Sequence, residues 1–310
     1  HGVQKALIST DVAYWKACFD WLKPSDRPQT AQTRIELGCP YDCGLCPDHE
    51  QHSCLALIEI NDHCNLTCPV CFANSSPARD GTRSLAEVDA MLNALVASEG
   101  EPDLVQISGG EPTLQLLKVD IHHLAKPKQI RRLMLNTDDS RIARDPAFVA
   151  ELARLKPGFE VYLQFDSLNP EALKNLRGGD LTRIRQQALE NLQVAGISTT
   201  LVVTVKKGVN DTEVSALINH ALGWPCVRGV TFQPIQDAGR NDGYDVNANR
   251  TLLSDIRRSI ITGANPFGAA DMIPLPCNPE SICIGYGLRQ GQNLVPITGM
   301  LPRETLIDVM

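Results

Sequence analysis

The chain has 310 residues, 43% of them apolar and 21% charged, a balance typical of soluble globular proteins with one or two domains. Its formal net charge of -7 disfavours nucleic acid as the main partner, because phosphate contacts need a basic surface. No apolar run approaches the ~20 residues that span a bilayer, and the first residues lack the features of a signal peptide. We therefore expect a cytoplasmic protein with no transmembrane segment. Since the chain starts at His1 and not at Met, we also expect an incomplete N-terminus.

Short apolar runs and helical patterns alternate from residue 55 onward, after a first helical pattern around Trp15 and Phe19. Ser84 with Glu87 is expected to form a capping box, and Asp211 is expected to cap a later helix. The segment 115–129 has poor periodicity and predicts no clear element. The apolar runs predict six strands, at 55–60, 104–108, 132–136, 161–167, 199–205 and 229–234. The patterns between them predict helices at 84–98, 146–155, 181–195 and 212–222.

Strands that alternate with helices at this spacing indicate parallel βαβ units. Six strands are too few to close an eight-stranded barrel, so the predicted fold is α/β, a partial, open (β/α)6 TIM-like barrel. Its active site is expected at the C-terminal ends of the strands. We expect an N-terminal extension at 1–54, the barrel at 55–235, and at 236–310 a C-terminal extension that caps the barrel mouth.

Seven of the eleven cysteines lie in the stretch 38–73, where the spacing C-x3-C-x2-C occurs twice. This tight spacing, in a chain without an export signal, favours metal ligation over disulfides. The first copy is Cys39, Cys43 and Cys46, and the second copy is Cys64, Cys68 and Cys71.

The second triad directly follows the first predicted strand, at the rim where a barrel places its catalytic residues. Three thiolates at this spacing can ligate three irons of a [4Fe–4S] cluster and leave the fourth iron open to a small molecule. A zinc knuckle is the alternative, but structural zinc prefers four closed ligands, usually in paired C-x2-4-C units. The second triad therefore fits an iron–sulfur cluster better than zinc.

The segment SGGEPTL, at 108–114, closes the second predicted strand, and with the second triad it resembles the radical S-adenosylmethionine (radical SAM) superfamily. The resemblance implies that the second triad holds a catalytic [4Fe–4S] cluster, and that Gly109, Gly110 and Glu111 bind S-adenosylmethionine (SAM). The glycines are expected to let the backbone approach this ligand closely. The implied reaction breaks a C–S bond of SAM by one-electron reduction, and the resulting 5′-deoxyadenosyl radical abstracts hydrogen from an unactivated carbon.

Polar residues also stand at the ends of the third and fourth predicted strands. Asn136, Gln164 and Asp166 are predicted to contact the ribose or the carboxylate of the cofactor, although such residues are also common as turn formers and helix caps. Asp138 and Asp139 stand where relatives usually have an Asn-Gly turn, which marks this turn as unusual.

The first triad precedes the barrel and does not lie at its catalytic rim. Either Cys54 or Cys277 would complete a set of four thiolates with it. Such a set, held by the two extensions, suits a second, auxiliary [4Fe–4S] cluster, with zinc as the alternative. Cys283 is a weaker ligand candidate.

The cysteine-rich stretch narrows the resemblance to one radical SAM subgroup, which contains methylases of the methanopterin pterin and archaeal tetraether lipid synthases. Stretches at 1–15, 162–178, 229–240 and 273–279 share this resemblance. It implies C–C bond formation at an unactivated carbon, with an electron donor such as flavodoxin or ferredoxin.

The most direct expectation is that a pterin-like small molecule is C-methylated. Coupling of lipid alkyl chains is the alternative, which the lack of a basic amphipathic helix disfavours. A non-catalytic metal-binding or redox-sensing protein is the alternative from another class, and it explains the cysteines but not the SGGEP segment.

Overall fold

The computed structural model describes residues 5–23, 27–31, 33–38, 41–42, 52–114, 128–276, 278–291 and 293–310. Its centre is a six-stranded parallel sheet with the strand order β1-β3-β4-β5-β6-β7, which follows the chain. Within the described residues β1 and β7 do not pair, so the barrel is open, as predicted. The strands are β1 (Ala56–Glu59), β3 (Leu104–Ser108), β4 (Arg132–Thr137), β5 (Phe159–Gln164), β6 (Ser198–Val205) and β7 (Val227–Pro234).

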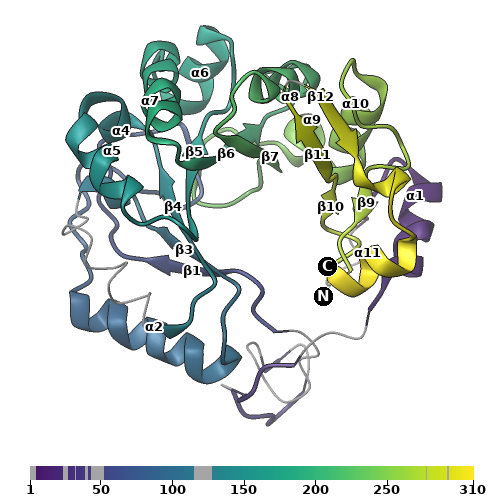
Figure 1. Cartoon of the computed structure of the whole chain (residues 1–310), viewed down its shortest axis with the longest axis horizontal. Helices are drawn as coiled ribbons and strands as arrows, with labels where there is room; N and C mark the ends of the chain where they lie inside the picture. The colour runs from purple at the N-terminus through teal and green to yellow at the C-terminus, as the bar shows by residue number, and fades with distance from the viewer. Residues whose placement is uncertain are drawn as a thin grey trace.

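Helices cover the outer side of this curved sheet (Figure 1). Ser84 caps the first of them and forms the predicted capping box with Glu87. In the described part of the chain, no helix combines the length and the apolar character needed to cross a bilayer. The helices are α2 (Leu85–Glu99), α4 (Ser140–Arg144), α5 (Pro146–Ala153), α6 (Pro170–Arg177), α7 (Thr182–Ala195) and α8 (Val214–Leu222).

The two faces of the sheet differ, because successive side chains of a strand point to opposite faces. On β4, Leu133 and Leu135 are buried in the main core, together with Val161 of β5. Asn136, between these leucines and the strand end, instead donates a hydrogen bond to the Ser108 hydroxyl of β3 at 3.3 Å. One face therefore supplies the core beneath the helices, and the other supplies polar side chains to the barrel interior.

The predicted strands and helices are confirmed with shifts at their ends, while the short helices α4 and α6 were not predicted. The strand predicted at 161–167 ends at Gln164, because the backbone turns at Asp166 with a φ of +61°. The prediction of Asp211 as a helix cap is wrong. Glu213 precedes α8, and the Asp211 carboxylate accepts a hydrogen bond within the preceding turn.

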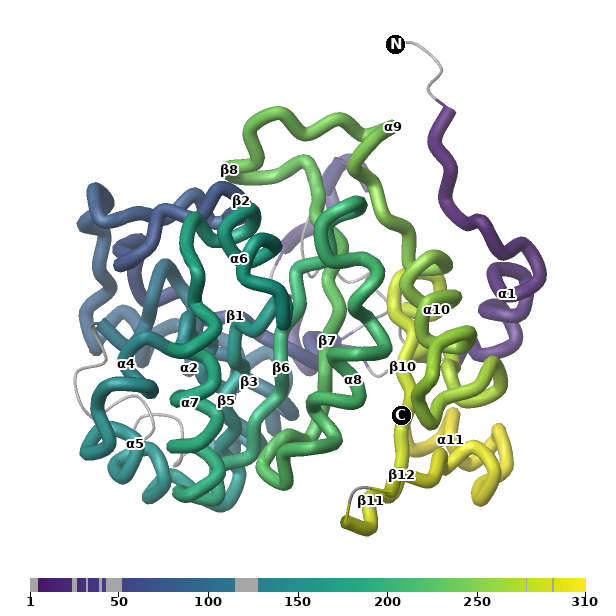
Figure 2. The backbone as a smooth tube through the Cα atoms, turned by 90° about the horizontal axis from the view of Figure 1, so that it is seen from above, coloured from purple at the N-terminus to yellow at the C-terminus, as the bar shows by residue number. Residues whose placement is uncertain are grey.

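The two extensions pack on each other beyond β7. The N-terminal one holds α1 (Val12–Ala17), which lies beside α10 in Figure 2. The Thr10 N–H donates to the Ser254 hydroxyl at 2.9 Å, and the Arg257 guanidinium lies 4.1 Å from the centre of the Tyr14 ring. The boundaries of the three predicted regions stay predictions. The C-terminal elements are β8 (Arg240–Asn241), α9 (Val246–Asn249), α10 (Leu253–Thr262), β9 (Ile273–Pro274), β10 (Cys283–Ile284), β11 (Gly287–Gln290), β12 (Asn293–Pro296) and α11 (Arg303–Val309).

Candidate active site

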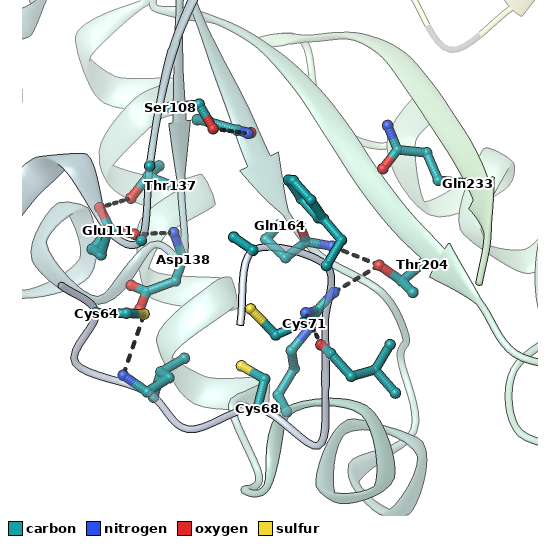
Figure 3. Close-up of a pocket in the computed structure, with 18 of the residues that line it drawn as sticks. Cys64, Cys68, Cys71, Ser108, Glu111, Thr137, Asp138, Gln164, Thr204 and Gln233 are labelled. Atoms are coloured by element: carbon teal, nitrogen blue, oxygen red, sulfur yellow. Dashed lines mark hydrogen bonds between the residues drawn. The ribbon is translucent and has the colours of Figure 1, made fainter. Parts of the chain in front are cut away.

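A cavity of about 210 Å³ lies at the C-terminal ends of the strands, and it brings the predicted segments together. The loop 61–73, here called the cysteine loop, carries the three sulfurs of the second triad. Figure 3 shows the Glu111 and Asp138 side chains beside Cys64. Asp166 is the one predicted site residue of the barrel that does not line the cavity. The predicted residues on the lining are Cys64, Cys68, Cys71, Gly109, Gly110, Glu111, Asn136 and Gln164.

The two glycines after β3 allow a close contact with the cysteine loop. The Gly110 N–H donates to the Asn61 carbonyl at 2.8 Å, and the Glu111 N–H donates to the His63 carbonyl at 2.8 Å. A Cβ atom on Gly110 would overlap the His63 carbonyl, and one on Gly109, whose φ is +145°, would overlap Asn61. Packing between the two loops therefore requires glycine at these positions, and their contact with a ligand stays a prediction.

Glu111 is buried, and four donors hold its carboxylate. Oε1 accepts hydrogen bonds from the Thr113 N–H at 2.9 Å, the Thr113 hydroxyl at 2.5 Å and the Thr137 hydroxyl at 3.0 Å. Oε2 accepts one from the Asp138 N–H at 2.6 Å. Burial, with the neighbouring Asp138 carboxylate, raises the pKa of Glu111 to about 8 despite these donors. The protonation state of Glu111 is therefore sensitive to a cation bound beside it, because a cation would favour the ionised carboxylate.

The unusual turn after β4 adds two carboxyl groups. Asp138 Oδ1 accepts a hydrogen bond from the Ser140 N–H at 3.0 Å, whereas its buried Oδ2 has no hydrogen-bond partner among the described residues. Asp139 has a φ of +75°, the left-handed conformation that favours the glycine expected there. Burial raises the pKa of Asp139 well above its usual range, and Arg185 Nε lies 3.6 Å from its Oδ2. The turn thus leaves Asp138 with a free carboxylate oxygen beside the cavity.

The three thiols line the cavity but do not converge on one point. Cys64 and Cys68 are buried and Cys71 is partly exposed. In the described residues, no three His, Cys, Asp or Glu side chains are placed to hold a single metal ion. A [4Fe–4S] cluster needs no such meeting point, because each thiolate binds a different iron. Burial raises the pKa of Cys64 to about 12, so metal binding must displace its proton. The donor set fits a cluster with one open iron.

Arg177, which sequence reasoning missed, anchors the cysteine loop. Its Nη1 donates to the Val70 carbonyl at 3.2 Å, and its Nη2 donates to the Thr204 hydroxyl at 2.7 Å. Its Nε and Nη2 donate to the Asp166 carboxylate at 2.7 and 2.8 Å. Burial raises the pKa of the Cys68 thiol, and the nearby positive charge of Arg177 partly opposes this shift. The Asn169-Pro170 start and the Gly178 end of α6 were the sequence signals for this helix.

Asp166 lies behind the cavity and is shared by two arginines. Its side chain is wholly buried, and Arg185 Nη2 donates to it at 2.9 Å. Burial opposes the charged form, but the guanidiniums of Arg177 and Arg185 hold the pKa of Asp166 well below its usual range. Gln164, by contrast, reaches the cavity and donates to Asp166 Oδ1 at 2.8 Å. A direct cofactor contact thus suits the position of Gln164 better than that of Asp166.

The C-terminal extension also holds the cysteine loop. Its strand β8 pairs in antiparallel fashion with the short strand β2 (Val70–Cys71) of the loop. Arg240 Nε donates to the Cys68 carbonyl at 2.5 Å, and its Nη2 donates to the Ser75 carbonyl at 2.9 Å. Arg177 and Arg240, from different parts of the chain, therefore fix the same loop.

The predicted auxiliary ligands fall mainly outside the described residues. Cys54 lies within them and is exposed. Cys283 is partly buried on β10, and burial raises the pKa of its thiol. The auxiliary site stays a prediction. Its other members, Cys39, Cys43, Cys46 and Cys277, lie outside the described residues.

Comparison with known proteins agrees with this site. The sequence model of the radical SAM superfamily matches residues 58–221. The chain is 32% identical over 260 residues to the 7,8-dihydro-6-hydroxymethylpterin dimethyltransferase of Methanocaldococcus jannaschii, covering 82% of this chain and 50% of that protein. It is 29% identical over 227 residues to the GTP 3′,8-cyclase of Brucella canis, covering 69% of this chain and 61% of that protein. The chain belongs to the radical SAM superfamily and is a radical SAM enzyme, a class that implies a [4Fe–4S] cluster and SAM.

Solved structures show the same fold. SuiB of Streptococcus suis, bound to SAM, matches with a TM-score of 0.53 and 17% identity, covering 67% of this chain and 46% of that one. The FeFe-hydrogenase maturase HydG of Carboxydothermus hydrogenoformans matches with a TM-score of 0.53 and 18% identity, covering 67% and 49%. This chain spans only about half the length of these proteins and of the pterin dimethyltransferase.

Proposed function

We propose that this enzyme methylates a carbon of a pterin-like small molecule, using SAM and a [4Fe–4S] cluster held by Cys64, Cys68 and Cys71. The likeness to the pterin dimethyltransferase of M. jannaschii, over 82% of this chain, carries the proposal. When bound, the cluster would supply the electron that breaks a C–S bond of SAM. The protein's own task is to bind and orient SAM and the substrate.

The polar groups beside the thiols support a SAM site. The α-ammonium group of SAM is a cation, and Glu111 and Asp138 present carboxyl groups on that side of the cavity. Asp138 Oδ2 is the oxygen that lacks a partner among the described residues, so it is free to accept a hydrogen bond from this ammonium. Asn136 and Gln164, whose amides both donate and accept, are proposed to bind the ribose or the carboxylate of SAM.

The polar lining further along supports a heterocyclic substrate. Thr204 and Gln233 continue the cavity wall beyond Gln164, and Gln233 Nε2 donates to the Tyr162 hydroxyl at 3.2 Å. Amides and hydroxyls can pair with the ring nitrogens and the carbonyl of a pterin. These polar side chains are compatible with the pterin-like substrate that the likeness to the pterin dimethyltransferase supports.

We also propose an auxiliary [4Fe–4S] cluster at the first triad, completed by Cys54 or Cys277, and a flavodoxin or ferredoxin as the electron donor. Cys54 supports this because its thiol is exposed. A chain with two [4Fe–4S] clusters contains about eight iron atoms, and a chain with one cluster contains about four. Cys43→Ala is expected to lose about half of the iron, whereas unchanged iron content would remove the first triad from the ligand set.

The first test is the formation of 5′-deoxyadenosine from SAM by anaerobically reconstituted, reduced protein. Wild type is expected to cleave SAM and Cys68→Ala is expected to be inactive. Cys226→Ala is the matched control, because Cys226 is also a buried cysteine but packs in the main core. Cleavage by Cys68→Ala at the wild-type rate would refute the assignment of the second triad.

The substrate is tested in the same reaction mixture by mass spectrometry. With 7,8-dihydro-6-hydroxymethylpterin and a folate-type one-carbon donor in the mixture, we expect a product heavier by one methyl group in place of hydrogen. GTP and an archaeal lipid with free alkyl ends are tested in parallel. Turnover of GTP or of the lipid, with the pterin unchanged, would replace the pterin proposal with the corresponding alternative.

A further inference from the structure

We propose that Arg177 raises the reduction potential of the catalytic cluster by holding a fixed, buried positive charge against the cysteine loop beside Cys68. The inference rests on the proposed function, because it requires the cluster at Cys64, Cys68 and Cys71. Arg177 acts here through a ligand of the cluster, so it is a positioning residue and not a reacting group.

The guanidinium of Arg177 is held in place from several directions. Asp166 accepts two of its hydrogen bonds, at 2.7 and 2.8 Å, and the Thr204 hydroxyl accepts another at 2.7 Å. A further N–H group reaches the Val70 carbonyl at 3.2 Å, between two of the cysteines. Only 10% of its side chain is exposed. The guanidinium therefore has little freedom to turn away from the cysteine loop.

The surroundings of Arg177 leave its charge only partly neutralised. Asp166 is the carboxylate that it contacts, and Arg185 binds the same carboxylate at 2.9 Å. The next carboxyl group, that of Asp139, is 0% exposed and lies 3.6 Å from Arg185 Nε, but neither of its oxygens has a hydrogen-bond partner among the described residues. Burial outweighs the attraction of that guanidinium and favours the neutral form of the carboxyl group. Two guanidiniums thus share one ionised carboxylate, and this leaves net positive charge beside the cysteine loop.

This charge favours the reduced cluster. Reduction adds one electron to the cluster and its thiolates, so the reduced form carries more negative charge. Nearby charge is one of the means by which proteins set the potentials of iron–sulfur clusters. Because the site is largely shielded from water, the electrostatic effect of Arg177 is screened less than that of a surface charge.

The test compares wild type with Arg177→Gln, Arg177→Lys and Lys174→Gln, each reconstituted without oxygen and without SAM. Iron content and a potentiometric titration followed by electron paramagnetic resonance are measured for each protein. Lys174→Gln is the matched control, because it removes a positive charge from the exposed face of the same helix. Arg177→Lys keeps the charge but cannot make all of the arginine's hydrogen bonds at once.

We expect Arg177→Gln to have a more negative midpoint potential than wild type, Arg177→Lys to lie between them, and Lys174→Gln to equal wild type. A wild-type potential in Arg177→Gln with full iron content would overturn the inference. Loss of iron from both Arg177 variants, with the fold intact by circular dichroism, would also overturn it and leave Arg177 a purely structural role. If wild-type protein itself forms no [4Fe–4S] cluster, the proposed function fails instead.

Discussion

Asp166 accepts two hydrogen bonds from the Arg177 guanidinium, at 2.7 and 2.8 Å, although a carboxylate at the end of a barrel strand would be expected to face a ligand. Its charge therefore serves the protein's own structure, by fixing an arginine that reaches the cysteine loop. The sign of the pKa shift has a consequence for stability. Because the folded-state pKa of Asp166 is depressed, its stabilisation is present above the unfolded pKa of about 4 and is lost as the pH falls below it.

Asp166→Asn is expected to destabilise the protein by about 3–5 kcal/mol, because it leaves two buried arginines without their shared carboxylate. Unfolding in denaturant, followed by circular dichroism on iron-free protein, measures this free energy. Asp242→Asn is the control, since Asp242 is exposed on the C-terminal extension and its loss should cost within about 0.5 kcal/mol. An equally small effect of Asp166→Asn, with weaker SAM binding, would show that Asp166 contacts the cofactor after all.

For Glu111 we predict a pH dependence of stability opposite in sign to that of Asp166. Its folded-state pKa of about 8 lies above the ordinary value of 4.5, so its favourable contribution is complete below about pH 4.5 and is lost as the pH rises toward 8. We expect iron-free protein to unfold at a lower denaturant concentration at pH 8 than at pH 6. Glu111→Gln, which cannot ionise, should reduce this difference. The same difference in wild type and in Glu111→Gln would contradict the role assigned to Glu111.

Asp138→Asn tests the free carboxylate oxygen beside the cavity. The asparagine can still accept the hydrogen bond from the Ser140 N–H, so the turn should keep its shape. A charge-assisted hydrogen bond to the ammonium group of SAM is worth about 1.5–3 kcal/mol, so its loss should weaken SAM binding about tenfold or more. Equilibrium dialysis with reconstituted protein measures the affinity, with Asp242→Asn again as the control. Unchanged affinity would show that the ammonium binds elsewhere.

Gly110→Ala tests the contact between the two loops. The added methyl group would overlap the His63 carbonyl, which belongs to the backbone and cannot turn away. We expect a loss of about 1–3 kcal/mol or more in stability, together with weaker retention of iron by the displaced cysteine loop. Gly179→Ala is the matched control, because a Cβ atom there would meet nothing within 4 Å. Similar melting temperatures and iron contents for the two variants would argue against this packing role.

The barrel was predictable from the sequence because its strands and helices have strong local patterns. The apolar run that contains Leu133 and Leu135 is typical of a buried strand, and the helix after Ser84 begins with a complete capping box. The cysteine triad and the Gly-Gly-Glu-Pro segment could likewise be recognised from their spacing in the sequence. In the structure both line one cavity.

The roles of Asp166 and Arg177 could not be predicted in the same way. The sequence pattern of an aspartate at a strand end is the same whether its side chain faces a ligand or a buried arginine. From the sequence alone, an arginine at a helix C-terminus is usually interpreted as a favourable partner of the helix dipole. The contact between α6 and the cysteine loop decides between these roles. The two segments are about a hundred residues apart in the chain, so their contact produces no local sequence pattern.

Arg240→Gln tests whether the C-terminal extension helps to hold the cluster. Arg240 donates to the Cys68 and Ser75 carbonyls, and β8 pairs with the strand that contains Cys71. Because these contacts are to the backbone, the substitution should loosen the loop and speed the loss of iron to a chelator. Arg228→Gln, on an exposed part of β7, is the matched control and should lose iron at the wild-type rate. Equal rates in both variants would mean that the barrel alone fixes the cysteine loop, and Arg177 would then be its main anchor.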